Sequence, residues 1–339
     1  MLTTDRRRFL LSLPALTLLP RARGAQGGGA TLRVRGINHV GLAVSDLKRS
    51  TEFYEALFGM PVRRQGDTIA RLQIGAGPHH LELLRAEAGA TPSISHYCLG
   101  IEGFDVDRVV STLSAHGVEK ADAVAPLKVR VTARPAGGSS IQLGDPDGLA
   151  VQLQDANYCG GSGPLGAVCG APDGAVRKGL IALKGYSHLT VFAGDAQKSN
   201  AFFREVFGMG IRSYQGPTAP TLAAGSGVEF LMFTGGGGGR AGAPARAARI
   251  NHFCMSVDNF KPEEILKTLE SVGVKPRENQ TGSVGPMRHY ISMRMENRGG
   301  AKDGTPELYF TDPDGLLVQL QDVKYCGGSG YLGDVCPQV

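Results

Sequence analysis

One eleven-residue segment occurs twice in the chain and decides how the chain is organised. Residues 145–155 read DPDGLAVQLQD, and residues 312–322 read DPDGLLVQLQD. Each copy combines a turn signal with a following strand-like alternation of apolar and polar residues. Self-similarity of this kind indicates that the chain is built from repeated structural units.

Further segments repeat in the same order on either side of the chain midpoint. The matches are FYEALFGMPVR at 53–63 with FFREVFGMGIR at 202–212, ISHYCL at 94–99 with INHFCM at 250–255, and YCGGSG starting at 158 and again at 325. We therefore predict two modules, at residues 32–169 and 180–336, joined by a linker at 170–179. The total of 339 residues agrees with this division, because a domain typically has about 150 residues.

Within each module, the order of elements itself occurs twice. A short strand is followed by an amphipathic helix and then by further short strands. In the first module, the strand at 37–44 precedes a helix that begins near Asp46, with Ser45 as its expected N-cap and Gly59 at its C-terminal end. Each module is thus expected to contain two strand–helix–strands units.

Four strands of each module place a coordinating side chain on a face that otherwise carries small or polar residues, since alternate residues of a strand share a face. These candidate metal ligands are His39, Glu82, His96 and Gln152 in the first module, and His188, Glu229, His252 and Gln319 in the second. Two imidazoles with a carboxylate and an amide oxygen can form an open site for Fe(II), Mn, Ni, Co or Zn. A hydrogen-bonded buried ring is the alternative for any single histidine, but matching pairs in both modules favour a metal.

These segments resemble the vicinal oxygen chelate superfamily, which includes glyoxalase I, extradiol ring-cleavage dioxygenases, fosfomycin-resistance proteins and bleomycin-binding proteins. The resemblance rests on NHVGL at 38–42, FYEALFGM at 53–60, LEL at 81–83, the strand at His96 and the two DPDG turns. It implies an α+β fold of tandem modules, each made of two βαβββ units that form a curved mixed sheet around a metal or ligand cleft. The resemblance also implies ligands on the first, fourth, fifth and eighth strands, which are the eight residues named above.

The chain departs from the family at the last ligand position of each module. The metal enzymes of the family usually carry glutamate there, whereas this chain has Gln152 and Gln319. An amide is a weaker ligand than a carboxylate, and Glu82 and Glu229 are expected to supply the missing charge. The expected cofactor is a divalent metal, with Fe(II) or Mn(II) favoured and Zn, Ni or Co as alternatives.

Tyr309 is the candidate catalytic residue for an oxygenase. Residues 308–315, LYFTDPDG, resemble the signature of extradiol enzymes, and a tyrosine there can hydrogen-bond or protonate a substrate oxygen. The first module has Gln142 at this place, so the second module is the better catalytic candidate. A purely structural tyrosine remains the alternative.

The leading functional hypothesis is an exported metal-dependent enzyme, most simply a dioxygenase, that acts on a small aromatic or vicinal-oxygen substrate. The first alternative is a glyoxalase-like lyase or isomerase, with Glu229 or Glu82 as the base. The second is a metal-free protein that sequesters a small molecule. We expect the two modules to pair within the chain, while the oligomeric state stays open.

Residues 1–25 have the three parts of an export signal, namely a basic start, a short apolar core and small residues at the end. The stretch RRRFL at 6–10 resembles the twin-arginine type, which predicts a periplasmic or secreted protein.

Without residues 1–25 the net charge falls from +5 to about +1, and a nearly neutral protein has no electrostatic footprint for nucleic acid. No apolar run has the roughly 18 residues that a membrane span needs, so no integral membrane segment is expected in the mature chain.

The cysteines and two arginines also follow the repeat. Export together with the repetition predicts disulfides Cys159–Cys169 and Cys326–Cys336, each closing a glycine-rich loop. Arg134 and Arg294 occupy matching positions, where either contact with an anionic substrate or a solvated sheet edge explains them.

Overall fold

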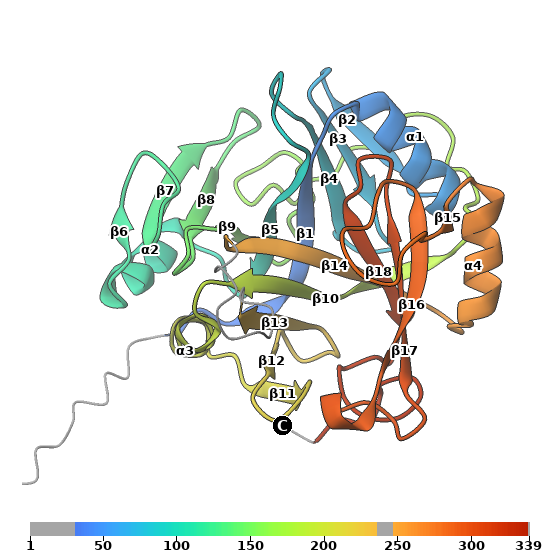
Figure 1. Cartoon of the computed structure of the whole chain (residues 1–339). Coiled ribbons are helices and arrows are strands. Elements are labelled where there is room, and N and C mark those ends of the chain that lie inside the picture. The colour runs from blue at the N-terminus through green and yellow to red at the C-terminus, as the bar shows by residue number, and fades with distance from the viewer. Residues whose placement is uncertain (1–30, 236–246, 338–339) are drawn as a thin grey trace, which may run out of the picture.

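The computed structural model describes residues 31–235 and 247–337 of the chain. It contains two nine-stranded mixed sheets, one from each module, with a few helices packed against them (Figure 1). The predicted α+β fold of two tandem modules is therefore confirmed. The predicted export signal at residues 1–25 lies outside the described residues.

The first sheet has the strand order β2-β3-β4-β1-β5-β9-β8-β7-β6, so that β1 is flanked by β4 and β5. In chain order the elements of this module are β1 (Val34–Val44), α1 (Leu47–Phe58), β2 (Val62–Gln65), β3 (Ile69–Gln73), β4 (His80–Arg85), β5 (Ser93–Ile101), α2 (Val106–Ala115), β6 (Glu119–Lys120), β7 (Lys128–Ala133), β8 (Ser139–Gly144) and β9 (Ala150–Asp155).

The second sheet repeats this topology as β11-β12-β13-β10-β14-β18-β17-β16-β15. Its elements are β10 (Leu183–Ala193), α3 (Ala196–Phe207), β11 (Ile211–Tyr214), β12 (Pro220–Ala223), β13 (Phe230–Gly235), β14 (Arg249–Val257), α4 (Pro262–Ser271), β15 (Lys275–Pro276), β16 (Arg288–Arg294), a 3-10 turn (Glu296–Arg298), β17 (Thr305–Thr311) and β18 (Leu317–Asp322).

The first helix of each module is delimited by the same local signals. Asp46 caps α1 by accepting a hydrogen bond from the backbone of Arg49, so the N-cap is one residue later than Ser45. Gly59 ends the helix with a φ of 65°, a left-handed conformation that glycine adopts without steric cost. In the second module, Asp195 and Gly208 do the same for α3.

The central strand β1 separates the hydrophobic core from the polar face. Val40, Leu42 and Val44 point into the core and are fully buried. His39 and Gly41 alternate with them and therefore face the opposite side. Because β1 pairs with β4 in parallel and with β5 in antiparallel, side chains from all three strands meet on that side.

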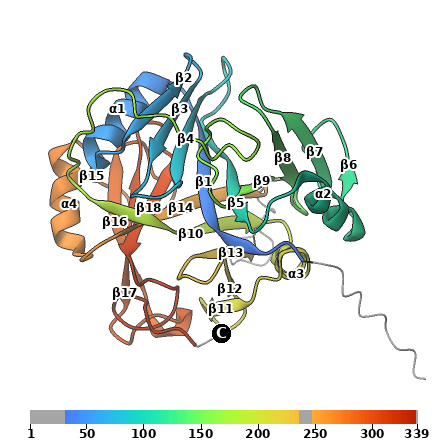
Figure 2. The same ribbon diagram turned by 180° about the vertical axis from the view of Figure 1, so that it is seen from behind.

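The two modules interlock, and the repeated DPDG turns form part of their contact. Helix α1 of the first module lies beside β16 and β18 of the second in both views (Figures 1 and 2). The hydroxyl of Tyr54 in α1 donates to Asp312 Oδ2 at 3.2 Å, and Arg49 forms an ion pair with Asp314. In the reverse direction, the backbone N–H of Gly194 donates to Asp147 Oδ2 at 3.0 Å.

Two glycine-rich loops are closed by the predicted disulfides, Cys159–Cys169 and Cys326–Cys336, which are confirmed. Arg134 and Arg294 hold these loops through carbonyl oxygens, the former at Gly163 and the latter at Gly328. Arg294 is fully buried, whereas Arg134 is half-buried just beyond the end of β7. The disulfides are compatible with an oxidising, exported compartment, and no helix in the described part of the chain is long and apolar enough to cross a membrane.

Candidate functional site

The four candidate ligands of the first module converge on one point. His39 Nε2 lies 3.3 Å from His96 Nε2 and 3.2 Å from Gln152 Oε1. Glu82 Oε1 lies 3.8 Å from His96 Nε2. All four side chains are buried. Nitrogen and oxygen atoms at such separations, drawn from four different strands, are arranged as the ligands of one metal ion would be.

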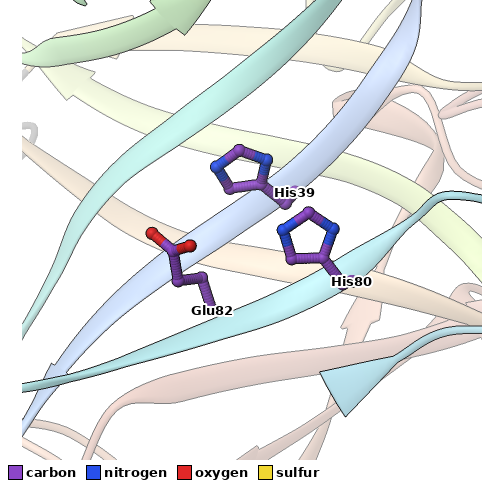
Figure 3. A group of neighbouring side chains, drawn as sticks. All are labelled: His39, His80 and Glu82. Atoms are coloured by element: carbon purple, nitrogen blue, oxygen red, sulfur yellow. The ribbon is translucent and has the colours of Figure 1, made fainter. Parts of the chain in front are cut away.

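His80 is a further member of this cluster that sequence reasoning missed. Its ring stacks on that of His39 with the centroids 4.5 Å apart, and Figure 3 shows the two rings side by side with Glu82 on the same strand as His80. His39, His80 and Glu82 offer ligand atoms that all lie within 4.8 Å of one another. Among the described residues, His80 Nε2 has no hydrogen-bond partner although it is buried.

Gly41 allows these ligand atoms to meet. It pairs with Glu82 on β4 and with His96 on β5, so it lies between the two side chains. The ring of His96 crosses directly over it, because a Cβ atom at position 41 would lie only 2.0 Å from His96 Cε1. Any larger residue at this position would displace the imidazole from His39 and Glu82.

The electrostatics of the cluster match what a metal requires. Burial lowers the pKa of His39, His80 and His96, which keeps the imidazoles neutral and able to donate a lone pair. Burial alone would raise the pKa of Glu82, but Arg71 and the neighbouring histidines reverse this and lower it. Arg71 Nε donates to Glu82 Oε2 at 2.7 Å and so fixes the orientation of the carboxylate.

A cavity of about 520 Å³ gives access to this cluster. Its walls include Glu82, His96 and Gln152 from the cluster, together with Arg71 and the aromatic ring of Tyr158. This volume is within the range of small-molecule sites. A molecule in the cavity would lie directly against three of the converging side chains.

In the second module, His188, His252 and Gln319 lie around one cavity, but no carboxylate stands at the position of Glu82. His188 Nε2 lies 3.0 Å from Gln319 Oε1, and the rings of His188 and His252 have centroids 5.6 Å apart. Among the described residues, His252 Nε2 is buried without a hydrogen-bond partner. Burial lowers the pKa of His252 to about 4.

Two substitutions account for the difference between the modules. Thr190 takes the place of Gly41, because it pairs with His252 on one side and with Met232 on the other. Met232 in turn takes the place of Glu82. Within the described residues, the second module therefore contains no group of three histidine, cysteine or acidic side chains arranged to hold a metal.

The expectation that Glu229 matches Glu82 is wrong by three residues. Glu229 lies before β13 and is the counterpart of His79, because Phe230 pairs with His188 as His80 pairs with His39. It points toward the first module, where the backbone N–H of Ile37 donates to its Oε2 at 2.7 Å. Glu229 is thus a residue of the contact between modules and does not reach the second-module site.

Glu229 should make stability pH-dependent. Burial raises its pKa to about 8, and the hydrogen bond from Ile37 offsets this only in part. Between pH 4.5 and pH 8 the folded state therefore binds more protons at this group than the unfolded state, so a rise in pH destabilises the fold. We expect Glu229→Gln to remove this term, and its stability relative to wild type to increase by up to about 1.4 kcal/mol per pH unit.

Urea unfolding of both proteins at pH 5, 6, 7 and 8 measures this difference. The matched control is Glu278→Gln, because Glu278 is exposed and pairs with Arg288. An unfolding difference between Glu229→Gln and wild type that stays constant over this range would contradict the assignment.

Tyr309 lies beside a smaller cavity of about 240 Å³ in the second module. Its ring packs edge-on against His252 with centroids 5.4 Å apart, and its hydroxyl donates to Glu307 Oε2 at 3.2 Å. Glu307 was not among the predicted residues. It also accepts hydrogen bonds from Arg294 at 2.9 Å and from Tyr325 at 3.2 Å, so this carboxylate is held by the protein itself.

Known structures share this fold at low sequence identity. The Mn(II)-bound glyoxalase from Novosphingobium aromaticivorans is 19% identical, with a TM-score of 0.59 over 85% of this chain and 82% of that chain. Catechol 2,3-dioxygenase is 16% identical, with a TM-score of 0.56 over 88% of each chain. Homoprotocatechuate 2,3-dioxygenase from Arthrobacter globiformis is 15% identical, with a TM-score of 0.57 over 86% of this chain and 81% of that chain.

No curated protein sequence matches the chain. The family model described as the Glyoxalase/Bleomycin resistance protein/Dioxygenase superfamily matches residues 36–153 and again residues 185–320. The two matched segments contain the two clusters described above and cover most of the chain. This confirms the resemblance seen in the sequence, and the chain belongs to the glyoxalase/bleomycin resistance protein/dioxygenase superfamily.

Proposed function

We propose that the protein is an exported metal-dependent enzyme whose single metal centre lies in the first module. The observation that carries the proposal is the convergence of His39, His96, Gln152 and Glu82 at the end of an open cavity. Two neutral imidazoles with one carboxylate suit Fe(II) or Mn(II), and Zn, Ni or Co are the alternatives. The Mn(II)-bound glyoxalase of the same fold supports this ligand chemistry.

The reaction we propose is oxygenation of a small substrate with vicinal oxygens, such as an aromatic diol. The fold shared with two extradiol-type dioxygenases supports this class. A divalent metal in this site would polarise substrate oxygens and hold them in a fixed orientation. The residues of the chain would contribute the rest: Arg71 holds Glu82 in place, and Tyr158 forms an aromatic wall of the cavity.

The second candidate is a glyoxalase-like lyase or isomerase, which the buried Glu82 favours. Its carboxylate faces the cavity and its lowered pKa keeps it ionised, as a general base must be. In either case Tyr309 and Glu229 have no catalytic part in our proposal. Tyr309 serves to hold Glu307, and Glu229 serves the contact between the modules.

Metal-dependent oxygen uptake tests the proposal and separates the two reactions. The full chain, loaded with Fe(II) or Mn(II), is supplied with 3,4-dihydroxybenzoate or catechol in an oxygen electrode, and with a methylglyoxal–thiol adduct in a spectrophotometric assay. We expect oxygen uptake that falls at least about 100-fold in His96→Ala and changes less than about twofold in His252→Ala, because His96 lies beside both the His39 imidazole and the Glu82 carboxylate.

Turnover of the methylglyoxal adduct without oxygen uptake would replace the oxygenase by the lyase. Loss of activity in His252→Ala with retention in His96→Ala would contradict the assignment to the first module. Thermal unfolding of both variants shows whether a loss reflects the site or the fold.

A further inference from the structure

The cavity of the first module has an excess of positive charge. Three charged side chains line it, namely Arg71, Glu82 and Arg134. Arg71 forms an ion pair with Glu82 at 2.7 Å, so these two charges largely balance. In the described part of the chain, no carboxylate oxygen lies within 4.0 Å of the Arg134 guanidinium.

The contacts of Arg134 leave its charge uncompensated. Its Nη2 donates to the carbonyl oxygens of Gly163 at 3.0 Å and Pro164 at 2.9 Å, and its Nη1 donates to Gly161 O at 3.3 Å. The ring of Tyr158 lies 5.4 Å from its Cζ. These partners are neutral, and the guanidinium is therefore held rigidly at the cavity wall with its full positive charge.

In the second module, the arginine that corresponds to Arg134 has a carboxylate partner. Arg294 is the counterpart of Arg134 and also holds a stapled loop, but its Nε donates to Glu307 at 2.9 Å. Gln142 pairs with Gln152 as Tyr309 pairs with Gln319, so position 140 corresponds to position 307. The residue there is Ser140, which lines the cavity without supplying a charge.

We propose that the first-module cavity takes a small anionic molecule, with its carboxylate facing Arg134, and that Ser140 is the position that permits this charge preference. The proposal deepens the proposed function by naming the substrate class of the same site. The charge preference is attributed to Arg134 and Ser140, and it can be tested without a metal.

Ser140→Glu tests the proposal by giving the first module the arrangement of the second. The new carboxylate has a guanidinium at the matching position, as Glu307 has in Arg294, so the fold should accept it. Ser140→Gln is the matched control, because it adds nearly the same volume without the charge. Because the longer side chain reduces the cavity volume for a charged and a neutral probe alike, the ratio of the two affinities reports the effect of charge.

Binding of benzoate and benzamide to the metal-free full chain is measured by calorimetry or ligand-detected NMR. We expect wild type and Ser140→Gln to prefer benzoate by about fivefold at low salt, and Ser140→Glu to bind both probes equally. The preference should shrink as salt is added. Equal affinities in wild type, or an unchanged preference in Ser140→Glu, would overturn the proposal.

The same comparison with 3,4-dihydroxybenzoate and its amide on the Mn(II)-loaded protein, without oxygen, separates this proposal from the proposed function. If the protein binds benzoate more tightly than benzamide but takes up no metal, the anion preference is supported and the proposed metal-dependent activity is refuted. Metal uptake with equal affinity for both dihydroxy probes would refute the anion preference and leave the metal centre intact.

Discussion

Gly41→Ala is expected to weaken metal binding by the first module strongly. The added Cβ would lie 2.0 Å from His96 Cε1 and 2.2 Å from His96 Nδ1, so the ring must leave its place between His39 and Glu82. The backbone at this position has no left-handed φ, and alanine fits the strand itself. We expect the affinity for Mn(II) to fall by on the order of 100-fold, because one ligand is lost and the others are left misplaced.

Titration with Mn(II), followed by electron paramagnetic resonance of the free ion, measures this loss. Gly185→Ala in β10 is the matched control, since a Cβ there would meet nothing closer than Ser256 Oγ at 3.9 Å. It should bind Mn(II) as wild type does. Affinity for Mn(II) within about twofold of wild type in Gly41→Ala would show that His96 is not a ligand.

The repeat, together with the resemblance to the superfamily, was sufficient to predict the fold and the four first-module residues that converge. Alternation along the strands placed His39, Glu82, His96 and Gln152 on one face, and the structure brings all four together. The resemblance to the superfamily supplied the order of the strands that carry them. The same reasoning failed for Glu229, where a shared glutamate next to apolar residues suggested an alignment that the pairing of β10 with β13 excludes.

Two parts of the site were not predictable from the repeat. His80 has no histidine counterpart, because Phe230 stacks on His188 in its place at 4.5 Å, and an argument from matching pairs passes over it. The sequence shows glycine at position 41 and threonine at the matching position 190. The importance of this difference depends on where the His96 ring lies, directly over Gly41. Such a contact becomes visible only when the side chains are placed in three dimensions.

In the second module, the arginine and the carboxylate beside the cavity bond to each other. Arg294 is fully buried and joins Glu307 to the stapled loop at Gly328. A buried ion pair of this kind is costly to break, because removal of one partner leaves an unpaired charge. We infer that these bonds keep Glu307 from binding a metal, whereas Oε1 of Glu82 faces His96.

Alanine substitutions of the matching histidines His39 and His188 are expected to have opposite effects on metal content. His39 lies within 3.3 Å of two other candidate ligands. His188 Nε2 lies 3.0 Å from Gln319 Oε1, and the carboxylate nearest in the lining of its cavity, Glu307, is bonded to Arg294. His39→Ala should therefore lose the metal, and His188→Ala should retain it. The two substitutions are matched because the histidines occupy the same position of the repeat.

The decisive measurement is elemental analysis of the purified protein and of these two variants. We expect close to one Fe or Mn per chain in wild type and in His188→Ala, and none above background in His39→Ala. Two metal ions per chain, no metal after supplementation, or loss in His188→Ala with retention in His39→Ala would contradict a single metal centre in the first module.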